Sequence, residues 1–143
     1  SLEDAQDVVS SFLTELGVDR YSYEILEGSG LTRYNKVNAE MYIKMLKYMY
    51  DDRFLFDYFM NSLSIAGKDG TLKNRMIGTE AEGNVYEKTG TINSVSALSG
   101  YVIDKDSEVL MFYVVMNGFG GNATEMRAAQ DDVCILLSQF SRN

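Results

Sequence analysis

Three strand-like stretches in the second half of the chain constrain its fold more than any other feature. They cover residues 84–92, 95–103 and 108–117, and each is rich in β-branched or aromatic residues. The connections are Asn93-Ser94 and residues 104–107, which consist mostly of typical turn residues. Because such short connections join only antiparallel neighbours, the pattern predicts a three-stranded antiparallel meander.

Helical patterns precede and follow this meander. Amphipathic helices are predicted over residues 1–16 and 38–50, and a further helix begins at Asn122 or Thr124. Asn38 and Asn122 are favourable N-cap residues. The last helix is expected to bury one face, made of Met126, Ala129, Val133, Leu136, Leu137 and Phe140. Helices grouped before and after the strands indicate an α+β fold with an antiparallel sheet, in one compact domain.

Composition argues against several classes of function. The 143 residues include 21 acidic and 13 basic ones, a formal net charge of -8, which argues against a nucleic-acid partner or an anionic lipid surface. The longest apolar run, Val109 to Met116, is too short to span a bilayer. The same run predicts that the third strand is buried on both faces.

The absence of one residue type also limits the chemistry. The chain contains no histidine, so a Ser-His-Asp or Cys-His mechanism within it is excluded. Cys134 is the only cysteine and is expected to be a packed small side chain rather than a reactive thiol. No metal site and no cofactor are expected.

The first of the three strands carries the candidate site, Lys88-Thr89-Gly90-Thr91. Residues two apart on a strand share a face, so Thr89 and Thr91 are expected on one face and Lys88 with Gly90 on the other. Gly90 lets another molecule approach the backbone. A lysine, two hydroxyls and an accessible backbone can hold a carboxylate and polarise a carbonyl. The alternative is an ordinary strand with a solvent-facing lysine.

Lys-Thr-Gly is one of three short signatures of the penicillin-recognising serine enzymes, and the others are Ser-x-x-Lys and Ser-x-Asn. Four further stretches match in order and spacing: Gly28 to Arg33 with Asn35, Ala66 to Leu72 with Arg75, Leu98 to Tyr101, and Asn117-Gly118. Together these residues resemble a D-alanyl-D-alanine carboxypeptidase and endopeptidase family, the low-molecular-mass class C penicillin-binding proteins. The resemblance implies part of a β-lactamase/transpeptidase-like fold.

The resemblance also implies roles for four residues. Lys88 would stabilise negative charge and order the proton network around the serines. The Thr89 and Thr91 hydroxyls would bind the terminal carboxylate of a peptidoglycan stem peptide or of a β-lactam. The backbone N–H of Thr91 would be one of two oxyanion donors, and Gly90 would permit the close approach. Lys88 and Thr91 are thus the expected catalytic residues, and residues 88–91 the expected substrate-binding segment.

The other two signatures are not where the family has them. The chain has no Ser-x-x-Lys, and its only Ser-x-Asn, residues 141–143, follows Lys88 in the wrong order. The resemblance therefore implies that residues 1–143 are the C-terminal part of the domain, with the nucleophilic serine, its lysine and the second serine upstream. The whole enzyme would hydrolyse D-Ala-D-Ala bonds through an acyl-enzyme outside the cytoplasmic membrane, with an export signal in the missing part.

Two other classes of protein fit the sequence. One is a non-catalytic relative that binds peptidoglycan or a partner, and the other is a structural domain whose Lys-Thr-Gly is coincidental.

The resemblance also has a consequence for the sheet. The family's sheet has five strands, so two are expected to come from the missing part and to pair with the third strand. Residues 108–117 would then be an exposed edge here, and we expect the chain to dimerise or aggregate through it.

Overall fold

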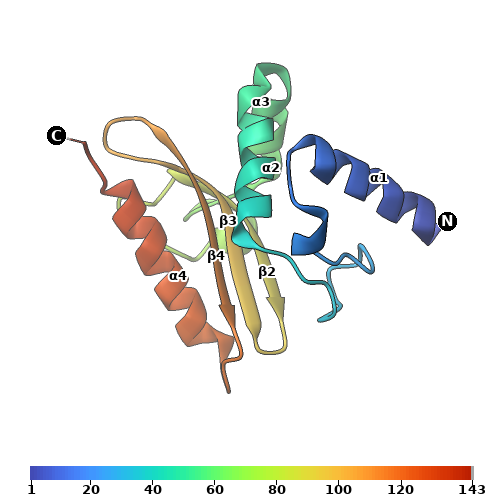
Figure 1. The fold of residues 1–143 in the computed structure, drawn as a ribbon. Coiled ribbons are helices and arrows are strands. Elements are labelled where there is room, and N and C mark those ends of the chain that lie inside the picture. Colours follow the sequence, from blue (N-terminus) through green and yellow to red (C-terminus); the bar gives the residue numbers. More distant parts are fainter. Residues whose placement is uncertain (143) are drawn as a thin grey trace.

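The chain folds as an antiparallel sheet with helices on both faces (Figure 1). The computed structural model describes residues 1–142. The helices are α1 (Leu2–Glu15), α2 (Ala39–Asp51), α3 (Arg53–Ser62) and α4 (Ala123–Ser138). The strands are β1 (Ser64–Ile65), β2 (Val85–Ile92), β3 (Val95–Ile103) and β4 (Val109–Asn117). Two 3₁₀ turns, η1 (Arg20–Ser22) and η2 (Gly70–Leu72), lie in the connections.

The sheet confirms the predicted meander and adds one strand to it. Its order is β1-β2-β3-β4, and every neighbouring pair is antiparallel. The expectation that both strands beyond the meander come from outside the chain and pair with β4 is wrong for β1, which pairs with β2. β1 has two residues, too few for a visible alternation. Within residues 1–142, β4 is the outer strand on the other side.

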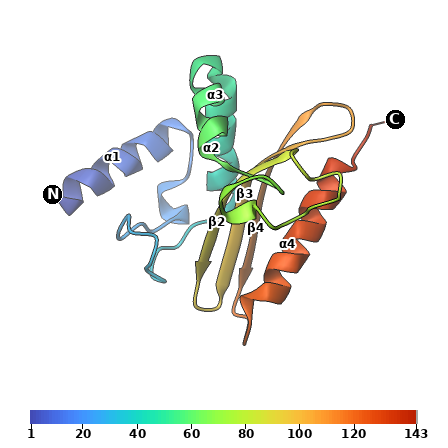
Figure 2. The same cartoon turned by 180° about the vertical axis from the view of Figure 1, so that it is seen from behind.

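The two faces of the sheet are covered by different helices. α4 lies along one face, and α2 and α3 lie on the other, as the two opposite views show (Figures 1 and 2). The core under α4 includes Val85, Leu98, Phe112 and Cys134. The core under α2 and α3 is centred on Leu46, Leu63 and Tyr101. The sheet is therefore the middle of three layers.

Tyr101 and Gly100 fix the middle of β3. The Tyr101 hydroxyl is buried and donates a hydrogen bond to the carbonyl oxygen of Leu46 in α2, at 2.7 Å. A Cβ atom at Gly100 would lie 2.0 Å from the carbonyl oxygen of Tyr86 on β2. Only glycine therefore lets β2 and β3 approach this closely.

The predicted helix starts are confirmed by their caps. The Asn38 side chain accepts from the N–H of Met41, and that of Asn122 accepts from the N–H of Thr124. Within residues 1–142, no helix has both the length and the apolar character needed to cross a membrane.

Two predictions of burial are wrong. Leu136 and Phe140 of the expected α4 face are 67% and 44% exposed, whereas Gln130 and Ser138 are buried. These polar side chains tolerate burial because Gln130 pairs with Ser96, and Ser138 donates to the carbonyl of Cys134. Cys134 itself is buried, as expected.

The second error concerns β4. It was expected to be buried on both faces, but only Phe112 is fully buried among its residues. The other face of β4, towards α2, borders an open pocket at its C-terminal end, where Val115 is exposed.

Candidate active site on the free edge of β2

β2 separates the site residues onto the predicted faces. Tyr86 packs in the core beneath α2 and α3, and Val85 packs in the core beneath α4. By the period of two, Lys88 and Gly90 follow Tyr86, and Thr89 and Thr91 follow Val85. The prediction that the two threonines share one face, opposite the lysine, is confirmed by this alternation.

The outer edge of β2 is open beside these residues. β1 pairs only with Tyr86 and Glu87, and within residues 1–142 no strand pairs with β2 beyond them on that side. The carbonyl of Val85 points to this side, since it accepts from the N–H of Ala66. Backbone groups alternate in direction along an antiparallel strand, so the N–H of Thr91 also points to the free edge.

Lys88 lies against this edge with its charge uncompensated. Its Nζ donates to the carbonyl oxygen of Thr89 at 2.7 Å, and its side chain is exposed. Among the described residues, no carboxylate lies within ion-pair distance of Lys88. A positive charge and an outward N–H therefore meet on one open strand edge, which is a favourable arrangement for an anion.

A short chain of hydroxyl groups supports Thr89. The Thr89 hydroxyl donates to Thr71 Oγ1 at 3.2 Å, and the Thr71 hydroxyl donates to Ser64 Oγ at 3.4 Å. Gly70 makes this possible, because its φ is +54° and a Cβ there would lie 2.2 Å from Ser64 Oγ. Thr71 belongs to the stretch Ala66 to Leu72 that carried the resemblance, but no sequence signal pointed to Ser64.

Sequence reasoning also missed Glu87, the residue before Lys88. Its side chain is fully buried, and burial raises its pKa to about 7, opposed by the nearby charges of Arg75 and Lys88. The alternation of Val85, Glu87 and Thr89 along the strand places Glu87 on the inner face of β2. An acidic residue on a buried strand face is unusual, and this is the sequence signal that could have identified it.

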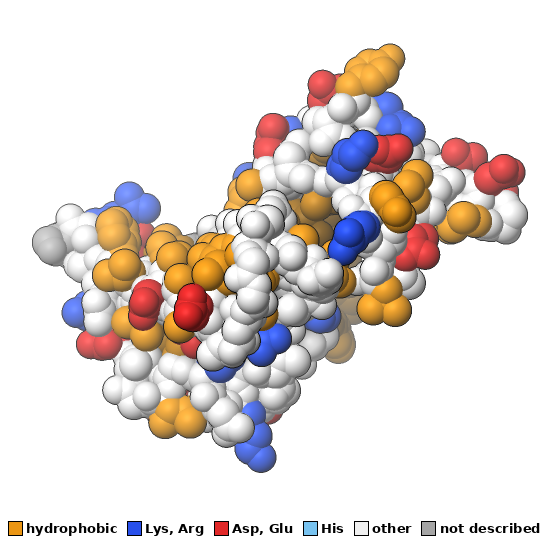
Figure 3. All heavy atoms as spheres, turned by 90° about the horizontal axis from the view of Figure 1, so that it is seen from below, with side chains coloured by type: hydrophobic (Ala, Val, Ile, Leu, Met, Phe, Trp, Pro, Cys, Tyr) orange, Lys and Arg blue, Asp and Glu red, His pale blue; other side chains and the backbone are white. Residues whose placement is uncertain are grey.

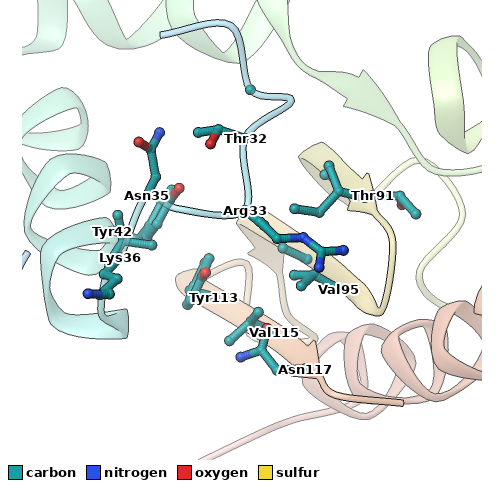
Figure 4. A pocket seen from close by; sticks show the side chains of 15 residues that line it. Thr32, Arg33, Asn35, Lys36, Tyr42, Thr91, Val95, Tyr113, Val115 and Asn117 are labelled. Carbon is teal, nitrogen blue, oxygen red and sulfur yellow. The ribbon is translucent and has the colours of Figure 1, made fainter. Parts of the chain in front are cut away.

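A pocket of about 450 Å³ opens beside the end of β2. Figure 4 shows Arg33 extending from the loop before α2 across the ends of the strands, with Thr91, Tyr113 and Asn117 around it. Tyr113 stacks on Tyr42 of α2 with ring centroids 4.2 Å apart, and burial raises the Tyr113 pKa to about 12. The phenol therefore stays neutral. The pocket joins a basic side chain to the open edge of β2.

Charge on one face of the molecule is mixed. On the face seen in Figure 3, basic and acidic side chains alternate with hydrophobic ones and form no continuous patch of one sign. Within residues 1–142, no group of three or more Cys, Asp or Glu side chains is placed to hold a metal ion.

The first two residues of the C-terminal Ser-x-Asn lie at the other end of the sheet. Ser141 and Arg142 contact Asp106 in the β3–β4 hairpin. The open part of β2 leads instead to the β2–β3 turn. Asn143 lies outside the described residues. Ser141 and Arg142 are therefore not part of the Lys88 site.

The fold and the open Lys-Thr-Gly edge define the class of protein. The structure of penicillin binding protein 4 from Haemophilus influenzae matches 98% of this chain with a TM-score of 0.87 and 24% identity, over 33% of that protein. The same protein complexed with a β-lactam matches 92% of this chain with a TM-score of 0.82 and 25% identity, over 32% of that protein. The chain thus has part of the penicillin-binding fold.

The family follows from the sequence match. Residues 1–139 match the model of the D-Ala-D-Ala carboxypeptidase 3 (S13) family, and the chain belongs to this family. It is 40% identical over 138 residues to a D-alanyl-D-alanine carboxypeptidase from Actinomadura sp. strain R39. That match covers 93% of this chain and 25% of the relative, so the chain spans about a quarter of that relative's length.

Proposed function

We propose that this chain supplies the Lys-Thr-Gly wall of the active site in a serine-type D-Ala-D-Ala carboxypeptidase. The observation that carries the proposal is the open edge of β2, where the Lys88 ammonium, the Thr89 hydroxyl and the outward N–H of Thr91 are neighbours. Relatives named D-alanyl-D-alanine carboxypeptidase support the reaction, and a relative complexed with a β-lactam supports the ligand class.

The substrate in this proposal is the D-Ala-D-Ala end of a peptidoglycan stem peptide. An extended peptide can add to an exposed strand edge through main-chain hydrogen bonds, and β2 offers such an edge beyond Glu87. Gly90 has no side chain to obstruct it. The terminal carboxylate of the peptide then lies near Lys88 and the hydroxyls of Thr89 and Thr91.

The chemical step uses the same edge. A serine outside this chain attacks the peptide carbonyl, and the N–H of Thr91 is one of two donors to the oxyanion that forms. Lys88 stabilises the negative charge and keeps the proton network of the upstream serine and lysine in order. Hydrolysis of the acyl-enzyme by water completes the reaction.

The remaining machinery is part of the proposal too. The Ser-x-x-Lys and Ser-x-Asn segments are expected upstream in the same polypeptide. The enzyme is expected to act in the periplasm or another extracytoplasmic part of the cell envelope, where peptidoglycan is found, with its export signal in the same upstream part.

Fluorescent penicillin tests this proposal in the full-length protein. We expect wild type to form a covalent adduct and Lys88→Ala to form it about a hundredfold more slowly, since one lost electrostatic contact in such a site costs roughly 3 kcal/mol of barrier. Lys73→Ala is the matched control, because Lys73 is also an exposed lysine and follows η2. An unreactive full-length wild type would instead favour a non-catalytic peptidoglycan-binding relative.

A further inference from the structure

Glu87 lies directly behind the open edge of β2. Its side chain is 0% exposed, and neither of its carboxyl oxygens has a hydrogen-bond partner within residues 1–142. In the sheet it pairs with Ser64 of β1 and Gly100 of β3. Next to it in sequence is Lys88, which points to the opposite face. A fully buried, unpaired carboxyl group is costly, and far more so when it is ionised, so its retention beside Lys88 calls for a role.

The groups that face Glu87 come from three elements besides its own strand. Arg75, from the loop after η2, forms an ion pair of 2.7 Å with Asp131 of α4, and their side chains are only 14% and 20% exposed. Arg75 is therefore paired with Asp131 and acts on Glu87 through its charge alone. Cys134 of α4 has its pKa raised to about 12 by burial and stays a neutral thiol. The Thr71 hydroxyl of η2 completes the surroundings.

These surroundings set the proton affinity of Glu87 near neutrality. Desolvation raises its pKa to about 7, and the charges of Arg75 and Lys88 limit the rise, while Asp131 adds to it. Glu87 thus changes charge within the physiological pH range, whereas a solvated glutamate does so near pH 4.

We propose that Glu87 is a proton-dependent tuning residue of the β2 edge: neutral, it leaves the Lys88 charge available to an anionic substrate, and ionised, it weakens the binding of that anion. This role rests on the proposed function. The charges of Glu87 and Lys88 interact across the strand, and on the buried side of Glu87 water does not screen this interaction fully. A negative charge there lowers the positive potential that the Lys88 ammonium and the Thr91 N–H present to a carboxylate.

Ionisation also acts on the hydroxyl chain. A carboxylate is a stronger acceptor than a hydroxyl oxygen, so an ionised Glu87 competes with Ser64 for the Thr71 hydrogen. Thr71 accepts the hydrogen bond of Thr89, and a turn of its hydroxyl therefore disturbs the position of Thr89. Both effects have the same sign, because both make the edge a poorer carboxylate site above the Glu87 pKa.

The test is the pH dependence of penicillin acylation in the full-length protein, measured as the second-order rate constant from pH 5.5 to 8.5. Wild type should lose roughly fivefold across a transition near pH 7, the low end of typical coupling between sites. Glu87→Gln, which is neutral at every pH, should keep the low-pH rate and lose this transition. Glu82→Gln is the control, because the pKa of Glu82 is lowered by Lys68 and Glu82 does not titrate in this range.

The outcomes separate this role from the function on which it rests. A reactive wild type whose pH profile is the same in Glu87→Gln refutes the tuning role alone. A wild type that does not react at any pH refutes the proposed function and the role with it. If Glu87→Gln is acylated slowly at every pH, Glu87 is needed for structure instead. Glu87→Ala tests this structural role, because it removes the carboxyl group without introducing an amide.

Discussion

Replacing Glu87 with glutamine should make the folded chain more stable at alkaline pH and leave it nearly unchanged at acidic pH. The folded state binds the Glu87 proton with a pKa of about 7, against about 4.5 in the unfolded chain. Between these values the folded state holds more protons, so the contribution of Glu87 to stability falls as pH rises, and the fall is complete above pH 7.

The magnitude follows from the same two values. At about 1.4 kcal/mol per tenfold change in proton affinity, the rise from 4.5 to about 7 corresponds to about 3 kcal/mol. This is an upper bound, because an ionised Glu87 can relax towards Arg75. Glutamine has no charge to bury, so the stability of Glu87→Gln relative to wild type should grow by up to about this amount between pH 5 and pH 8.

Urea unfolding of the protein that carries this chain measures the effect at the two pH values. The midpoint should shift with pH in wild type more than in Glu87→Gln, at constant slope. Glu82→Gln should instead shift with pH as wild type does, since the Lys68 ion pair lowers the Glu82 pKa and the contribution of that ion pair is fully present at both pH values. Parallel pH profiles for wild type and Glu87→Gln would refute the assignment of a buried, near-neutral carboxyl group.

Four further predictions concern the site and the sheet. Thr91→Val in the full-length protein should slow penicillin acylation less than Lys88→Ala does, because the backbone N–H survives the change. Residues 1–143 alone should form no covalent adduct with fluorescent penicillin, and a stoichiometric adduct on any serine would contradict this. Gly100→Ala should destabilise the fold by roughly 3 kcal/mol in urea unfolding, because the new Cβ overlaps a backbone oxygen of β2. The isolated chain should dimerise through the β4 edge in sedimentation experiments, and Val115→Lys should restore a monomer.

Val115 is the suitable position for that charge because of how β4 is packed. Val115 is 37% exposed on the face towards α2. Val114 packs against the core under α4, so a lysine there would disrupt folding as well as pairing. A chain that stays monomeric at high concentration would show that the β4 edge does not drive association.

Much of the sheet could be predicted because its signals are local. The runs that became β2, β3 and β4 begin and end within one residue of their predicted bounds, since turn residues and alternating side chains mark them directly. The shared face of Thr89 and Thr91 followed from the same alternation. These features depend on neighbours in sequence and not on the rest of the fold.

The missed features depend on contacts between distant segments. Ser64 became part of the site because η2 folds back on β1 and because Gly70 lets it approach. The face of α4 is shifted towards Gln130 because Ser96, on a strand far earlier in the chain, satisfies its amide. No local pattern encodes such a pairing, and apolar periodicity alone therefore chose Leu136 wrongly.

The bond from Lys88 Nζ to the carbonyl of Thr89 has a consequence for specificity. An unpaired strand edge can pair with any extended chain. Here, however, Lys88 of the same strand already occupies the Thr89 carbonyl, one of the backbone acceptors that an incoming strand would use. A partner must displace this ammonium from the carbonyl, and a segment that brings a carboxylate gives the ammonium a better acceptor. A neutral backbone offers no such exchange. If the proposed function holds, we expect the edge to favour an extended segment that brings a carboxylate to Lys88 over one that offers backbone groups alone.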